Sequence, residues 1–88
     1  MGTIEQKDRY TIDDLHQIMA LLRAPDGCPW DRVQTHASIR RNMIEEAYEA
    51  VDAIDRGNRT DMIEELGDVL MQVVFHAQIA AEDGAFAF

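Results

Sequence analysis

The sequence predicts an all-α protein, because three stretches carry apolar residues at helical spacing and no stretch shows the alternation of a β-strand. The chain has 88 residues, the length of one small domain. Hydrophobic residues make up 47%, enough for a globular core, and no apolar run is long enough to span a membrane. We therefore expect residues 1–88 to form a single helical bundle, soluble and cytoplasmic, with no membrane partner.

The first helix is expected over residues 12–23. Thr11 is a suitable N-cap, because its hydroxyl can accept hydrogen bonds from free N–H groups of the first turn, and two aspartates follow where the helix dipole favours negative charge. Pro25-Asp26-Gly27 ends this helix. Residues 24–34 contain both prolines of the chain and are predicted to form a structured loop.

The second helix is expected over residues 37–56, beginning near Thr35 to Ser38. Its apolar residues fall on one face at about 100° per residue, and they are Ile39, Met43, Ala47, Ala50, Val51 and Ile54. Gly57-Asn58 supplies the positive-φ backbone that closes a helix. This helix is therefore amphipathic and packs through one side.

The third helix should begin with Thr60 or Asp61 as its N-cap, with Glu64 completing a capping box, and should run to about Glu82. Apolar residues occur on almost every side of this helix, so several of its faces must pack against other parts of the protein. Three helices hardly suffice for that. We expect a second copy of the chain or a further stretch of chain to complete the bundle, which predicts a homodimer or larger assembly.

The charge is strongly acidic, with 17 Asp and Glu against 8 Lys and Arg and a net charge of -9. Such a surface repels phosphate backbones, so nucleic acid is not expected as a partner. The single cysteine, Cys28, excludes an internal disulfide and fits a reducing compartment. Nine of the 17 carboxylates lie between Glu45 and Asp68, which makes this segment the centre of interest.

Four carboxylates in this segment are candidates for one metal site. Glu46 and Glu49 are three residues apart on the second helix, and Glu65 and Asp68 repeat that step on the third, so each pair shares a helix face. A short connection between antiparallel helices would bring the two pairs together. Carboxylates so close need a compensating cation, and an all-oxygen site suits Mg²⁺, or alternatively Mn²⁺. Since Mg²⁺ commonly bridges carboxylates to phosphates, a phosphorylated ligand is implied.

A second interpretation stays open at this point, because acidic residues on helices usually form a solvated face. Glu46 borders the apolar side of its helix, whereas Glu49 lies farther round and would be exposed. Spacing alone does not choose between a metal site and a solvated face.

The sequence resembles the MazG-like nucleoside triphosphate pyrophosphohydrolases. The stretch Glu45–Glu49 followed by Glu65–Asp68 is similar to the EExxE and ExxD signature of that family. Further similar blocks are Leu22–Asp31, Gln34–His36 and Gln72–Ala77, so about residues 12–86 carry the resemblance.

The resemblance implies an all-α, dimeric, Mg²⁺-dependent enzyme that hydrolyses nucleoside triphosphates to the monophosphate and pyrophosphate. It implies that Glu46, Glu49, Glu65 and Asp68 are the metal ligands. Glu45 is then either an outer ligand or the group that orients the attacking water.

Family members usually continue into a segment rich in Lys, Arg and His, and this part of the domain is expected to be absent here. Arg41 and Asn42, with the preceding Arg40, are then the nearby candidates for phosphate contact. Trp30 either stacks on a nucleobase or plugs the end of the bundle. The alternative function is a catalytically weak or silent domain that binds nucleotide or dimerises.

Overall fold

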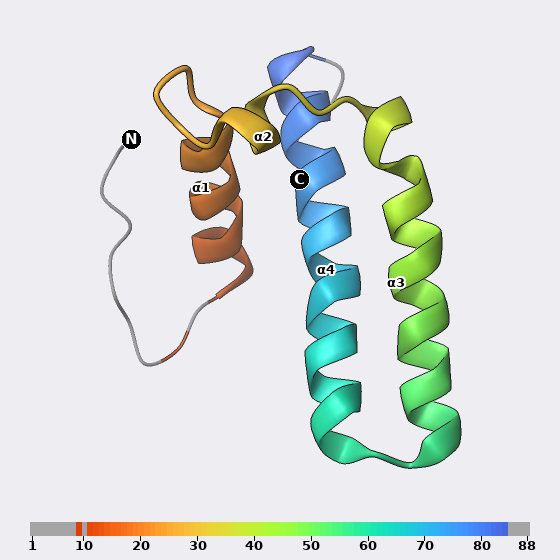
Figure 1. The fold of residues 1–88 in the computed structure, drawn as a ribbon. Helices are drawn as coiled ribbons and strands as arrows, with labels where there is room; N and C mark the ends of the chain where they lie inside the picture. The colour runs from red at the N-terminus through yellow and green to blue at the C-terminus, as the bar shows by residue number, and fades with distance from the viewer. Residues whose placement is uncertain (1–8, 10, 85–88) are drawn as a thin grey trace.

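The computed structural model describes residue 9 and residues 11–84. The described residues form four helices, α1 (Ile12–Arg23), α2 (Pro29–Arg32), α3 (His36–Arg56) and α4 (Arg59–Glu82). They contain no strand (Figure 1), which confirms the all-α prediction. The ends of the three long helices agree with the predicted ends to within three residues.

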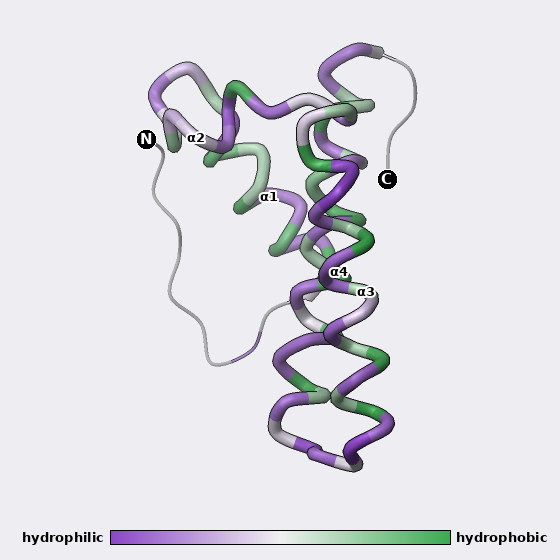
Figure 2. The backbone as a smooth tube through the Cα atoms, turned by 45° about the vertical axis from the view of Figure 1, so that its right-hand side comes forward, coloured by the Kyte–Doolittle hydropathy of each residue, from purple (hydrophilic) through white to green (hydrophobic). Residues whose placement is uncertain are grey.

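α4 is the central helix of the bundle. α3 and α4 run antiparallel as a long hairpin, and α1 packs on α4 from the other side (Figure 1). The hairpin connection lies at the far end of the molecule from α2 and is largely hydrophilic (Figures 1 and 2). Within the described helices, α3 packs against α4 alone. Any side chain buried on α3 is therefore covered chiefly by its hairpin partner.

Local hydrogen bonds explain where the helices begin and end. Thr11 and Thr35 both form capping boxes with the third residue of their helices, which confirms Thr11 as the predicted cap. Gly57 ends α3 with a φ of 67°, a left-handed conformation that glycine adopts without strain. The cap of α4 is Asn58, whose side chain accepts a hydrogen bond from the Asp61 N–H at 3.1 Å.

The prediction of Thr60 or Asp61 as that cap is therefore wrong. α4 begins at Arg59, directly after its cap, so the connection from Gly57 is shorter than expected. A shorter connection leaves the two arms of the hairpin less freedom to slide against each other.

The segment predicted as a loop contains a helix of one turn, α2. Its first residue is Pro29, whose fixed φ suits that position. Before it the chain folds back on α1, and the Cys28 N–H donates to the Leu22 carbonyl at 2.8 Å. Gly27 is required there, because a Cβ would lie only 2.3 Å from that same carbonyl oxygen. Four residues are too few to show helical periodicity in a sequence.

The core lies where α1 and α3 both reach α4. Its fully or almost fully buried members come from all three helices, and they are Met19, Ile39, Val74, Phe75 and Ile79. Nearer the hairpin connection, the buried side chains of α3 are Ala50 and Ala53, at 5% and 0% exposure. Because α3 packs only against α4, these alanines form a small-residue seam between the two helices.

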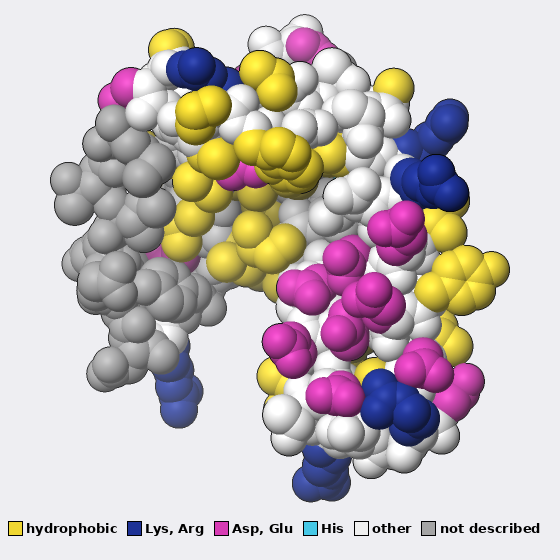
Figure 3. Space-filling view, viewed as in Figure 1, with side chains coloured by type: hydrophobic (Ala, Val, Ile, Leu, Met, Phe, Trp, Pro, Cys, Tyr) yellow, Lys and Arg dark blue, Asp and Glu magenta, His cyan; other side chains and the backbone are white. Residues whose placement is uncertain are grey.

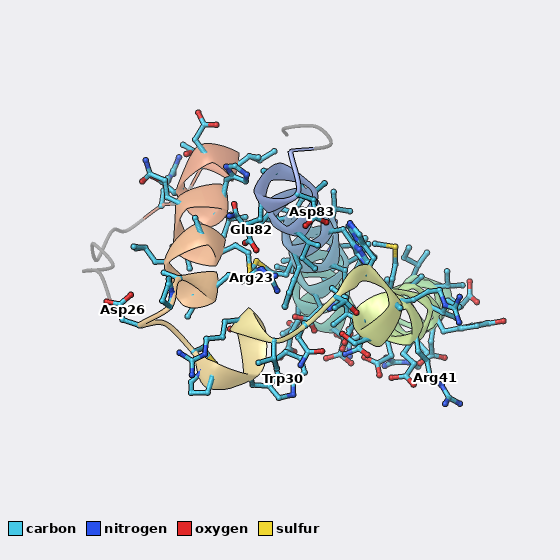
Figure 4. All side chains as sticks on the ribbon, turned by 90° about the horizontal axis from the view of Figure 1, so that it is seen from above. Arg23, Asp26, Trp30, Arg41, Glu82 and Asp83 are labelled. Atoms are coloured by element: carbon cyan, nitrogen blue, oxygen red, sulfur yellow. The ribbon has the colours of Figure 1, made fainter. Side chains whose placement is uncertain are left out.

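Arg23 ties α1, the α2 segment and α4 together. Its guanidinium donates to both oxygens of Glu82, at 2.8 and 2.9 Å, and to the carbonyls of Asp31 and Gln34, at 2.7 and 2.8 Å. It also lies over the Phe75 ring, 5.7 Å from the centroid. Figure 4 shows Arg23 and Glu82 between α1 and α4. With 7% of its side chain exposed, Arg23 is a nearly buried charged group that joins three parts of the fold.

Large apolar side chains remain exposed on both arms of the hairpin. They are Ile44, Tyr48, Val51 and Ile54 on α3 and Ile63, Leu66 and Val73 on α4. On α3, the first three line an open apolar groove together with Met43 and Ala47. The wide apolar arc predicted for the last helix is thus covered only in part.

None of the described helices combines the length and the apolar character needed to cross a membrane.

Candidate metal and nucleotide site

The carboxylates between Glu45 and Asp68 gather over the part of the hairpin nearest its connection. Figure 3 shows acidic side chains crowded on this face of α3 and α4. Glu46 and Glu49 reach it from consecutive turns of α3, and Glu65 reaches it from α4. The antiparallel hairpin therefore produces the convergence that the three-residue spacing predicted.

Three of the carboxylates lie close enough to share one cation. One oxygen from each of Glu46, Glu49 and Glu65 lies within 4.8 Å of the others. Glu46 and Glu65 are partly buried, and Glu49 is exposed. The cluster thus has one side against the helices and one side open to solvent.

The cluster is electrostatically strained without a cation. A hydrogen bond to Glu49, together with burial and the neighbouring charges, raises the pKa of Glu65 from 4.5 to about 7. Burial and the charges of Glu49, Asp68 and Glu45 raise the pKa of Glu46. All the charged groups that act on these two pKa values are carboxylates, so the described residues supply no cation to the cluster.

The cluster fits a divalent cation. Glu46 Oε2 and Glu65 Oε2 are both buried and have no hydrogen-bond partner among the described residues. Buried carboxylate oxygens without partners are costly, and a hard divalent cation bound by oxygen removes that cost. The donor set is all oxygen, which suits Mg²⁺ or Mn²⁺.

Asp68, the fourth predicted ligand, lies beside the three. Its charge raises the pKa values of both Glu46 and Glu65, but its oxygens are outside the group that lies within 4.8 Å. One turn farther along α4, Gln72 Oε1 is buried and has no hydrogen-bond partner in the part of the chain that the structure describes. In the sequence, Gln72 opens the similar block Gln72–Ala77, but no role was predicted for it.

Glu45 and Arg41 form an ion pair on the surface of α3. Arg41 Nε lies 3.6 Å from Glu45 Oε1, and 88% of the Arg41 side chain is exposed. Figure 4 shows Arg41 pointing away from the bundle. Asn42, the next residue, is partly buried. Arg41 is therefore free to turn toward an anion, while Glu45 lies beside the cluster and acts on the pKa of Glu46.

Trp30 lies at the end of the bundle near α2. Its ring meets Phe75 edge to face, with centroids 6.4 Å apart and an interplanar angle of 82°. It is nevertheless 56% exposed. One edge of the ring therefore packs on the core, while much of the rest faces solvent.

These features define an all-α domain with a cluster of carboxylates suited to a divalent cation. The family model for the MazG nucleotide pyrophosphohydrolase domain matches residues 34–88, which include all four predicted ligands. The chain belongs to that family, as the resemblance predicted.

Two of three similar proteins carry names of the same kind. The chain is 61% identical over 74 residues to a Thermotoga maritima protein named nucleoside triphosphate pyrophosphohydrolase/pyrophosphatase MazG, covering 84% of this chain and 29% of that protein. It is 54% identical over 78 residues to the Escherichia coli K12 nucleoside triphosphate pyrophosphohydrolase, covering 88% and 30%. It is 56% identical over 69 residues to the uncharacterized Bacillus subtilis protein YabN, covering 78% and 14%. The chain thus spans less than a third of each.

Proposed function

We propose that this domain hydrolyses nucleoside triphosphates between the α and β phosphates, releasing the monophosphate and pyrophosphate. The observation that carries this proposal is the convergence of Glu46, Glu49 and Glu65 within 4.8 Å. Membership of the MazG family and the names of the similar proteins support the reaction. We propose that residues 1–88 act as one domain, although residues 1–8, 10 and 85–88 lie outside the described part.

We propose Mg²⁺ as the cation, with Mn²⁺ as the alternative. Glu46, Glu49 and Glu65 would hold it, and Asp68 would add a fourth carboxylate from the adjacent turn of α4. A bound Mg²⁺ supplies Lewis-acid polarisation of the α-phosphate, activation of the attacking water and neutralisation of the pyrophosphate. Binding also requires Glu65 to release the proton favoured by its raised pKa, so cation and proton compete for this residue.

The remaining predicted residues would act on the substrate. We propose that Glu45 orients the attacking water, because it is exposed and next to Glu46. Arg41 and Asn42, one turn earlier on α3, would contact phosphate oxygens. The exposed part of Trp30 would offer a stacking surface for the base.

The decisive experiment measures pyrophosphate release from a panel of ribo- and deoxyribonucleoside triphosphates with Mg²⁺. Glu46→Gln and Glu65→Gln keep the side-chain shape but remove a charge from the cation, so activity should fall about 100-fold or more. Glu64→Gln is the matched control, since Glu64 is adjacent in sequence but exposed and outside the cluster. Helix content, measured by circular dichroism, should stay unchanged in all three variants.

If Glu64→Gln abolishes activity while Glu65→Gln spares it, the ligand assignment is wrong. If the parent binds Mg²⁺ and nucleotide but releases no pyrophosphate from any triphosphate, the catalytically silent binding domain replaces the enzyme as the function of this chain.

We further propose that a second copy of the chain covers the exposed apolar face of α3. Ile44, Tyr48 and Val51 line the groove there and are each more than half exposed. The same surface on two copies can meet across a twofold axis, as most homodimers do. Tyr48→Glu should shift sedimentation from dimer to monomer, and a parent that sediments as a monomer at micromolar concentration would contradict the proposal. The free thiol of Cys28 supports a reducing, cytoplasmic compartment.

A further inference from the structure

Two histidines from opposite arms of the hairpin meet away from the carboxylates. His36 begins α3 and His76 lies on α4, 40 positions later in the sequence. Their Nδ1 atoms are 2.7 Å apart, and the two rings are parallel to within 1°. Two imidazole nitrogens therefore point at each other across the interface between α3 and α4.

The contact requires at least one neutral ring. At 2.7 Å one Nδ1 donates a hydrogen and the other accepts it, so the two rings cannot both carry Nδ1 protons in this arrangement. Burial, and then the charge of His36, lower the pKa of His76. A neutral imidazole binds a metal through its unprotonated nitrogen, so the ring whose Nδ1 donates the hydrogen must carry its proton on Nε2 instead when both Nδ1 atoms bind.

We propose that His36 and His76 form a second metal site, which binds a divalent transition metal of the zinc type through their two Nδ1 atoms. Imidazole nitrogen is a preferred ligand of Zn²⁺, Cu²⁺ and Ni²⁺, whereas Mg²⁺ prefers oxygen. Two nitrogens bound to one tetrahedral Zn²⁺ lie about 3.3 Å apart, so the two nitrogens must separate by about 0.6 Å and the rings must turn until both lone pairs point at the metal. His36 is exposed, which leaves room for water to complete the coordination sphere.

This site is distinct from the carboxylate cluster. His36 precedes Glu46 by ten residues on α3, which places it about 15 Å away along the helix. His76 follows Asp68 by eight residues on α4, about 12 Å along that helix. The hairpin would thus present a hard oxygen site and a softer nitrogen site that select different metals.

A metal at the histidine pair would join the first turn of α3 to α4. It would thereby hold together the open end of the hairpin, opposite the covalent connection at Gly57. Because the two histidines converge only in the folded chain, binding should stabilise the fold in proportion to its affinity. Stability is therefore a readout that does not depend on catalysis.

The test is a calorimetric titration of Zn²⁺ into the full chain at neutral pH, with millimolar Mg²⁺ present to fill the carboxylate cluster. We expect one Zn²⁺ site per chain and a rise in the thermal unfolding midpoint. Either His36→Gln or His76→Gln should weaken Zn²⁺ binding at least tenfold and remove that rise. His16→Gln, which changes the third histidine on α1, is the control and should keep both.

Three results would overturn the proposal: no Zn²⁺ binding by the parent, equal binding by the parent and both variants, or loss of the site in Glu65→Gln instead. His36 is exposed at the helix start, so His36→Gln remains informative even if His76→Gln loosens the packing of α4. Pyrophosphate release measured on the same samples is independent of this outcome, so the two proposals fail separately.

Discussion

The two ends of the α3–α4 hairpin differ in almost every physical respect. At the end where α1 and α2 join the hairpin, large side chains such as Phe75 and Val74 are buried, and Arg23 satisfies several polar groups. At the two-helix end, residues 44–69, the buried side chains are alanines, and Glu46 Oε2 and Glu65 Oε2 are buried without a hydrogen-bond partner among the described residues. Large buried side chains are thus concentrated at one end and clustered carboxylates at the other, as expected where a candidate site must tolerate repulsion between its own groups.

The largest effect on stability is expected from Phe75→Ala. Phe75 is 5% exposed, and it contacts both Trp30 and Arg23. Its removal leaves a cavity and should cost about 3–5 kcal/mol in the free energy of unfolding, much of the total for a domain of this size. Urea unfolding followed by circular dichroism measures it. Arg59→Ala changes an exposed residue at the two-helix end and should cost less than about 0.5 kcal/mol. Equal losses of stability in the two variants would contradict the difference between the two ends.

A smaller loss is expected from Arg23→Met, which keeps the apolar stem but removes the guanidinium. The carbonyls of Asp31 and Gln34 then lose their charged donor, which should cost about 2–3 kcal/mol. Trp30, the single tryptophan of the chain, should report loosening of α2 through its fluorescence. Glu82→Gln keeps those two hydrogen bonds and should cost less. If both variants cost the same, the ion pair rather than the carbonyl contacts holds the segment.

The smallest effect on stability is expected at the cluster and depends on pH. Because the pKa of Glu65 is about 7 in the fold and near 4.5 unfolded, the folded chain holds the extra proton between these values. Without metal, the contribution of Glu65 to stability should therefore fall as pH rises from about 4.5 to about 7 and stay constant above. The lowered pKa of His76 acts in the opposite direction over part of this range.

The comparison of the parent with Glu65→Gln isolates the carboxyl, because the His76 contribution is common to both. The variant should gain stability relative to the parent as pH rises through that window, measured as the thermal midpoint with a chelator present. Parallel pH profiles would show that Glu65 titrates like an exposed carboxylate.

The long helices and the carboxylate cluster were predictable because their signals are local. Apolar periodicity defined each helix, and Gly57 defined the connection that brings Glu46, Glu49 and Glu65 together. The exact cap of α4 was missed, because Asn58 was assigned to the end of α3 and not to the start of α4. α2 was missed because one turn carries no period.

Contacts between distant positions were not predictable. The pairing of His36 with His76 depends on the register between α3 and α4, which no local pattern specifies. The role of Arg23 depends likewise on where α1 lies against α4. The position of Asp68 beside the three clustered glutamates reflects the same register. Sequence spacing shows which residues share a face of one helix. Which residues of another helix contact that face is known only from the packed structure.

The alanine seam affects the size of the cation that could fit between the glutamates of the cluster. Ala50 and Ala53 allow α3 and α4 to approach closely just where Glu49 and Glu65 face each other across the hairpin. Mg²⁺ demands oxygens at about 2.0–2.1 Å, whereas Ca²⁺ accepts about 2.3–2.6 Å. Two methyl groups therefore act as a spacer that sets how far apart the opposing glutamates lie. A bulkier side chain in the seam would widen the gap and favour larger cations, without any change to the ligands themselves.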